Sequence, residues 1–84
     1  MKHAGTDALA ELSELLQKLR NRPGLVERKP GVFYVKGKAF LHFHEDGDDI
    51  FADVRLGSMW ERHPVTSRAQ QRHLVRAIKN RLKP

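Results

Sequence analysis

The feature that most constrains the fold is the segment 39–56, in which two stretches of alternating apolar and polar residues flank Asp46-Gly47. A two-residue Asp-Gly loop favours a type I′ hairpin turn. In this register one face carries wholly apolar pairs: Phe43 with Ile50, Leu41 with Ala52, and Ala39 with Val54. The other face carries mixed pairs: His44 with Asp49, His42 with Phe51, and Phe40 with Asp53. Because a slip of one residue would mix the two sets, the sequence predicts a hairpin with a core face and an outer face.

Patterns on both sides of this hairpin predict the remaining elements. Leucines at helical spacing predict a helix over 6–21, with Thr6 or Asp7 as its N-cap. Strands are expected over 25–29, 32–36, 39–44 and 49–56, and a loop over 57–64. Ser67 and Gln70 have the spacing of a capping box, and the apolar residues that follow them predict a second helix over 67–82.

The turn before the hairpin leaves two arrangements open. A two-residue loop at Lys36-Gly37 places Val32 and Tyr34 on the core face. A three-residue loop places Phe33 and Val35 there instead. In both cases the expected fold is α+β, with a helix, a three- or four-stranded antiparallel meander and a helix, and with both helices packed on one face of the sheet.

Length and composition limit the class of protein. The 84 residues predict a single domain over 1–84. The absence of cysteine excludes disulfides and cysteine-ligated zinc. No apolar run approaches the roughly 18 residues of a membrane span, and no secretory apolar region follows the N-terminus. We therefore expect a cytoplasmic protein that does not act in a membrane.

The positive charge is concentrated near the C-terminus. The net charge is +6, and the segment 66–84 holds six basic residues and no acidic one. Four of these cations form one stripe along the predicted helix: Arg68, Arg72, Arg76 and Lys79. The helix dipole favours cations near the C-terminus and so does not explain Arg68 or Arg72. The stripe is either a solvated face or a surface for nucleic acid or an acidic protein.

The outer face of the hairpin is the second candidate site. His42 and His44 share this face and have the spacing for a metal or acid/base site. The predicted register places Asp53 about four residues from His44, too far for the two to share an ion. Asp49 lies nearer, and a further ligand could come from His63 in the following loop. The alternative is a solvated surface on which His44 pairs with Asp49. Because no complete ligand set is visible, no metal and no cofactor is predicted.

Aromatic residues extend this face into a candidate partner surface. Trp60 either caps the core or anchors a partner, and a surface of Phe40, Phe51 and Trp60 would suit a homodimer. The whole candidate partner or ligand face comprises Phe40, His42, His44, Phe51, Asp53 and Trp60. The chain has no cysteine nucleophile, no Gly-x-Ser-x-Gly elbow, no phosphate-binding glycine loop and no His-Glu-x-x-His, so no catalytic residue is predicted.

Four stretches of the chain carry a resemblance to known families. They are PGLVE (23–27), KPGVFYV (29–35), AFLHFHE (39–45) and FADVRL (51–56). Together they resemble a family of short bacterial hypothetical proteins, and the His-x-His-x-x-Gly hairpin is similar to the luciferase-like domain of unknown function. The resemblance implies a small α+β fold and no established activity.

A second resemblance concerns topology. The order of a helix, three strands and a helix is also that of double-stranded RNA-binding domains. The last helix begins with basic character here as it does there, although the Lys-Lys-x-Ala-Lys patch and the Gly-Pro-x-His loop of that family are absent. The combined expectation is a non-catalytic binding module.

Overall fold

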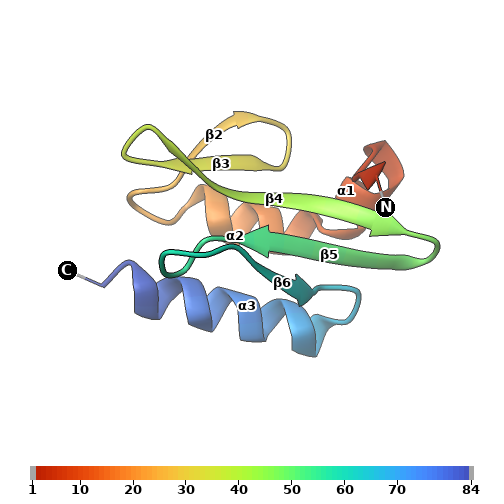
Figure 1. The fold of residues 1–84 in the computed structure, drawn as a ribbon. Coiled ribbons are helices and arrows are strands. Elements are labelled where there is room, and N and C mark those ends of the chain that lie inside the picture. The colour runs from red at the N-terminus through yellow and green to blue at the C-terminus, as the bar shows by residue number, and fades with distance from the viewer. Residues whose placement is uncertain (1, 84) are drawn as a thin grey trace.

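An antiparallel sheet forms one layer of the computed structural model, which describes residues 2–83 (Figure 1). Its strands are β1 (Lys2–His3), β2 (Val26–Lys29), β3 (Val32–Val35), β4 (Lys38–Asp46), β5 (Asp49–Val54) and β6 (Glu61–Pro64). They pair antiparallel in the order β2-β3-β4-β5-β6, and β1 pairs with β4 beyond the end of β3. The α+β class is therefore confirmed, and the sheet has more strands than the three or four predicted.

Three helices accompany the sheet: α1 (Thr6–Glu11), α2 (Ser13–Arg20) and α3 (Arg68–Arg81). The helix predicted over 6–21 is divided at Leu12, whose φ of −97° and ψ of 11° are not helical. The Leu12 N–H donates to the Leu9 carbonyl at 3.1 Å, one residue closer than in an α-helix. Because Leu12 is fully buried, the break redirects the backbone while this side chain stays in the core.

The N-terminal segment is fastened to β4. Its register places Lys2 opposite Glu45 and His3 opposite His44. The Gly5 N–H donates to Glu45 Oε2 at 2.7 Å, and Gly5 is the N-cap of α1 in place of the predicted Thr6 or Asp7. The sequence pattern did not predict β1, because two residues are too few to show an alternation.

The hairpin turn lies one residue further along the chain than predicted. Asp46 pairs with Asp49, so the loop is Gly47-Asp48 rather than Asp46-Gly47. Gly47 has a φ of +62°, which fits the preference of a type II′ turn for glycine at its first central position. The cross-strand pairs become Leu41 with Val54, His42 with Asp53, Phe43 with Ala52 and His44 with Phe51. Moving the turn by one residue shifts the cross-strand partner of each residue by two positions. These side chains therefore stay on their predicted faces of the sheet but have new partners.

A bulge in β4 moves Phe40 from the outer face to the core. The pairs on either side of it are Phe33 with Leu41 and Tyr34 with Ala39. Phe40 is thus an extra residue in β4, and the alternation of faces is interrupted there. Its side chain is 4% exposed and belongs to the core, which contradicts the prediction that it lies on the outer face.

The turn between β3 and β4 has the loop of one predicted alternative and the buried residues of the other. Val35 pairs with Lys38, so the loop has the two residues Lys36-Gly37, with φ values of +52° and +79°. A regular hairpin with this loop would turn Tyr34 towards the core. The bulge at Phe40 reverses the faces, so Phe33 is fully buried and Val35 packs against the core.

The segment predicted as a loop over 57–64 contains an edge strand. β6 pairs with β5, and Arg62 lies opposite Asp53. Its four residues, Glu-Arg-His-Pro, show no apolar alternation, which is why the strand was not predicted. Charged side chains of this kind are typical of sheet edges, where they discourage pairing with another chain.

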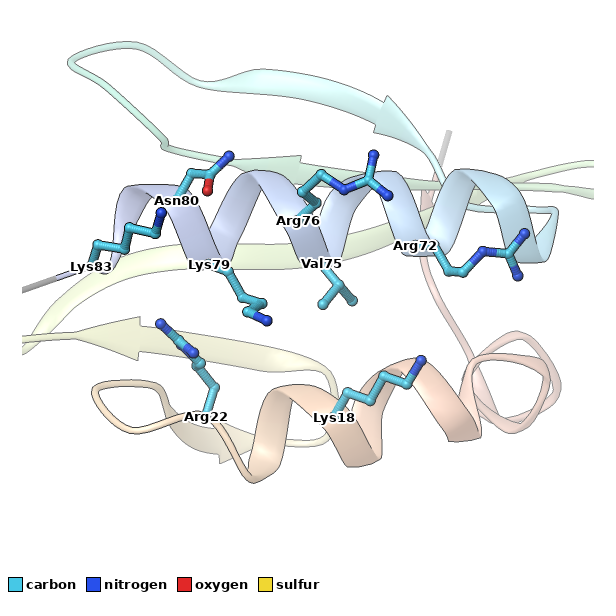
Figure 2. A pocket seen from close by; sticks show the side chains of 8 residues that line it. All are labelled: Lys18, Arg22, Arg72, Val75, Arg76, Lys79, Asn80 and Lys83. Atoms are coloured by element: carbon cyan, nitrogen blue, oxygen red, sulfur yellow. The ribbon is translucent and has the colours of Figure 1, made fainter.

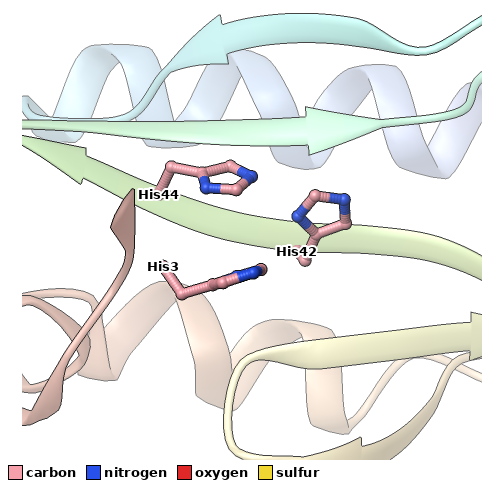
Figure 3. A group of neighbouring side chains, drawn as sticks. All are labelled: His3, His42 and His44. Carbon is pink, nitrogen blue, oxygen red and sulfur yellow. The ribbon is translucent and has the colours of Figure 1, made fainter. Parts of the chain in front are cut away.

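The helices α2 and α3 lie side by side over one face of the sheet (Figure 1). The fully buried large side chains come from both helices, from the break before α2, from the sheet and from the segment before α3: Leu12, Leu15, Leu19, Phe33, Leu41, Val54, Val65, Leu74 and Ile78. The predicted capping box at the start of α3 is confirmed: Ser67 Oγ accepts from the Gln70 N–H at 3.1 Å, and Gln70 Oε1 accepts from the Ser67 N–H at 3.0 Å. The apolar side chains of all three helices pack in this one core, so within residues 2–83 no helix packs on the opposite face of the sheet, which carries the histidines of β4 (Figure 3).

Candidate functional site

A groove between α2 and α3 gathers most of the predicted basic stripe. The hollow has a volume of about 400 Å³. It is lined by Lys18, Arg22, Arg72, Val75, Arg76, Lys79, Asn80 and Lys83 (Figure 2). In Figure 2, Lys18 and Arg22 point from the α2 side towards α3, and Lys79 points from α3 towards α2. Six of the eight lining residues are cationic and none is acidic. We call this hollow the cationic groove.

The charge of the cationic groove is not compensated by acidic partners. None of its six cations forms an ion pair within residues 2–83. Arg22 Nε is buried and has no hydrogen-bond partner among the described residues. A buried donor without an acceptor is costly, so this position favours a bound group that accepts hydrogen bonds.

Arg68 is the one predicted stripe residue that lies outside the groove. Its guanidinium pairs with Glu14 of α2 at 2.5 Å. This pair joins the N-terminal ends of the two helices, so α2 and α3 run in the same direction, and Arg22 and Lys83 lie near their C-terminal ends (Figure 2). The helix dipoles favour cations at that end of the groove. The sequence pattern did not single out Lys18 and Arg22; Arg22 follows the first predicted helix, over 6–21, by one residue, and its i, i+4 spacing from Lys18 was the one available signal for a shared face.

On the helix-free face of the sheet, three histidines converge. His42 and His44 belong to β4, and His3 of β1 lies opposite His44 (Figure 3). The ring centroids are 4.8 Å apart for His42 and His44, 4.9 Å for His3 and His44, and 6.0 Å for His3 and His42. One ring nitrogen from each residue lies within 4.8 Å of those of the other two. We call this group the histidine cluster; its third member was not predicted, because β1 was not.

Asp53 is a buried carboxylate beneath the histidine cluster. Arg62 binds it through two hydrogen bonds, Nε to Oδ1 at 2.8 Å and Nη2 to Oδ2 at 3.0 Å. The hydrogen bonds from Arg62 lower the pKa of Asp53, against the opposing effect of burial. His44 Nε2 lies 3.0 Å from Asp53 Oδ2. The prediction that Asp53 is too far from His44 was therefore wrong, because the shifted turn brings Asp53 opposite His42 rather than opposite Phe40.

His42 is the half-buried member of the cluster that packs against Trp60. Burial lowers its pKa, and the neighbouring His44 adds to this effect. The Trp60 ring packs against His42 with centroids 5.1 Å apart, and the Arg55 guanidinium lies 5.4 Å from the Trp60 ring centre. Trp60 stays 44% exposed and does not join the buried core. A neutral imidazole under an aromatic ring keeps a lone pair available at neutral pH.

The other residues predicted for the outer face do not belong to the histidine cluster. Phe51 is half-buried opposite His44, whereas Phe40 is in the core and cannot contribute to a surface for a second copy. Asp49 pairs with Asp46 rather than His44, and Thr66 Oγ1 lies 3.4 Å from its carboxylate. His63 pairs with Glu61 at 3.2 Å and does not reach the cluster.

Comparisons with known proteins found no matching family model, no matching curated protein and no matching solved structure. The resemblances proposed from sequence motifs therefore stay predictions. Within residues 2–83, no helix has both the length and the apolar character to cross a membrane. The function is therefore inferred from the cationic groove and the histidine cluster.

Proposed function

We propose that this protein is a non-catalytic binding module that holds the phosphate backbone of a nucleic acid in the cationic groove. The observation that carries the proposal is that α2, α3 and the residues just after each helix place six cations around one hollow without an acidic residue among them. Like charges brought this close repel one another, so the arrangement favours an anionic ligand that relieves the repulsion.

The dimensions of the groove favour an extended ligand over a single small anion. Arg72 and Lys79 are seven residues apart on α3, which corresponds to about 10 Å along the helix, and Lys83 extends the lining two residues past the end of α3. A nucleic-acid strand presents one phosphate for about every 3.4 Å of its axis, so the groove can face several phosphates in succession.

The character of the lining favours recognition without sequence preference. No aromatic side chain lines the cationic groove, so it offers no platform for base stacking. Lipid is the less favoured ligand, because the buried Leu74 and Ile78 leave α3 without an apolar face to insert into a bilayer. An acidic protein is the remaining competitor, and the test below separates it from a nucleic acid.

The proposal is tested by measuring the binding of fluorescently labelled DNA and RNA strands and duplexes by anisotropy, over a series of salt concentrations. If four of the cations neutralise phosphates, the logarithm of affinity should fall against the logarithm of salt concentration with a slope of about −3 for a single strand. The double variant R76Q/K79Q should bind a single strand more weakly and reduce the magnitude of the slope by about 0.7 for each lost cation.

A matched control removes the same charge elsewhere. Lys29 and Lys38 are exposed on the sheet and do not line the cationic groove, so K29Q/K38Q should retain most of the affinity. Equal losses in both double variants would show that net charge rather than the groove is responsible. Absence of binding to every nucleic acid at low salt would contradict the proposal, and binding of an acidic polypeptide instead would reassign the groove to a protein partner.

A further inference from the structure

We infer that the histidine cluster, His3, His42 and His44, is a binding site for a divalent transition-metal ion of the zinc class (Figure 3). The site lies on the helix-free face of the sheet and is independent of the cationic groove. Three imidazoles supply nitrogen ligands, which zinc and cobalt accept readily and which calcium and magnesium do not favour.

The geometry lies close to that of a coordinated ion. Zinc–nitrogen bonds of about 2.1 Å in a tetrahedron place the ligand nitrogens about 3.4 Å apart. The cluster nitrogens lie within 4.8 Å of one another, so closure requires movements of about an ångström. His3 is exposed on a two-residue strand, which leaves its side chain room to make most of that movement.

The surroundings of the cluster orient one ligand, His44, and leave a ring nitrogen of a second, His42, without a partner. Asp53 lies 3.0 Å from His44 Nε2, so a proton on that nitrogen is held by the carboxylate, and Nδ1 keeps its lone pair for an ion. Arg62 holds the same carboxylate in place through its two hydrogen bonds. His42 Nδ1 is buried and has no hydrogen-bond partner among residues 2–83. Histidine ligands of metals usually have such a carboxylate partner behind them.

An ion at this position would join the N-terminal strand to the centre of the sheet. Two residues of β1 pair with β4, and the Ala4 N–H donates to the Phe43 carbonyl at 3.1 Å. A bond from His3 to an ion shared with β4 would stabilise this short pairing. The cluster supplies three ligands among the described residues, which leaves the fourth tetrahedral position to water or to an external ligand.

The test uses the full chain without an oligohistidine tag. Cobalt is added and the visible absorption of the bound ion is recorded, and zinc is then titrated by calorimetry and by displacement of the cobalt. Trp60, the single tryptophan of the chain, packs against His42, so its fluorescence reports binding directly. We expect one ion per chain, and slower hydrogen exchange of the Ala4 amide when zinc is bound.

Substitutions of single residues test whether the three histidines of the cluster bind one ion together. H3Q, H42Q and H44Q should each weaken zinc binding by more than about 100-fold, and D53N, which alters a supporting group, by about 10- to 100-fold. R62Q removes the ion pair of Asp53 but leaves the Asp53 carboxylate on His44, so it should weaken binding less than D53N. The double variant H63Q/H73Q removes the other pair of histidines, whose rings are 6.1 Å apart, and should bind zinc as the unmodified protein does.

Three results would overturn the inference. They are no saturable binding of zinc or cobalt, a loss of binding in H63Q/H73Q equal to that in the cluster variants, or full binding by H3Q with unchanged exchange at Ala4. Because His3 is exposed, H3Q is expected to fold. If H42Q or H44Q fails to fold, H3Q alone still decides whether the cluster binds the ion. R76Q/K79Q should bind zinc normally, so failure of the nucleic-acid proposal and failure of this one are distinguishable.

Discussion

At the scale of single residues, Asp53 organises the outer face of the sheet. Its carboxylate accepts two hydrogen bonds from Arg62 and lies within hydrogen-bond distance of His44. Burying a charge is costly unless it is paired, and Asp53 meets that condition with a cation on the neighbouring strand. The same carboxylate lies within hydrogen-bond distance of His44, so the ion pair that compensates its buried charge also supports the proposed metal site.

The pH dependence of stability should show the burial of His42. Its folded pKa is lowered from the value of about 6.5 that is expected for an unfolded chain. The unfolded state therefore binds more protons just below that pH, so the free energy of unfolding should fall as pH drops below about 6.5. Urea unfolding at a series of pH values, with a chelator present, measures this fall.

The variant H42Q should flatten that part of the profile, and H73Q, which alters an exposed histidine of α3, should not. A profile for H42Q that is as steep as that of the unmodified protein would show that another group is responsible. The Asp53 carboxylate has a lowered pKa, so its contribution is lost at more acidic pH, below about 3.9, and does not interfere.

At the scale of elements, tight turns determine how the strands meet the helices. Gly31, in the turn between β2 and β3, has a φ of +76° and is buried, and its N–H donates to Glu27 Oε2 at 2.9 Å. A Cβ at this position would lie 2.9 Å from Leu9 Cδ2 and 3.5 Å from Phe43 Cδ2. The turn is therefore the place where α1 rests on the sheet, and only glycine fits there without a shift.

Replacing this glycine should destabilise the protein more than replacing one in an open turn. G31A and G37A both place an alanine at positive φ, which costs about 1–2 kcal/mol. G31A must also displace Leu9, whereas a Cβ at Gly37 meets nothing within 4 Å. Urea unfolding should therefore give a larger loss for G31A, and equal losses would show that the contact with α1 contributes no stability.

At the scale of the whole molecule, the sheet separates two surfaces of different chemistry. The cationic groove lies on the side of the helices, and the histidine cluster lies on the opposite side. The core between them includes Phe40, which the bulge turns inward, whereas Phe51 stays half-buried on the outer face. A ligand on one surface therefore has no direct contact with the other, and each can be altered separately.

The two phenylalanines should respond differently to truncation. F40A should lower the free energy of unfolding by about 3–5 kcal/mol, because it leaves a cavity in the core. F51A should cost less, since part of that side chain is already in water. Denaturant unfolding compares them, and F40L serves as the milder change if F40A does not fold. Equal effects would contradict the placement of Phe40.

The apolar faces of the hairpin were predictable because they depend on neighbours in sequence. Alternation along 39–56 assigned Leu41, Phe43 and Ile50 to the core, and all three are buried. The position of the turn was not determined in the same way, because Asp46-Gly47 and Gly47-Asp48 are both acceptable loops and give the same faces. The choice between them decides whether Asp53 lies opposite His42, and so whether the histidines have a carboxylate beneath them.

The sequence by itself determined the α+β class, the two faces of the hairpin, the capping box at Ser67 and the cations of the last helix, since each depends on local spacing and backbone geometry. The tertiary structure decided which of these residues meet. Packing of α2 beside α3 placed Lys18 and Arg22 opposite the basic stripe, and pairing of β1 with β4 brought His3 to the other histidines. These contacts join residues distant along the chain, and such pairings leave no periodic pattern in the sequence.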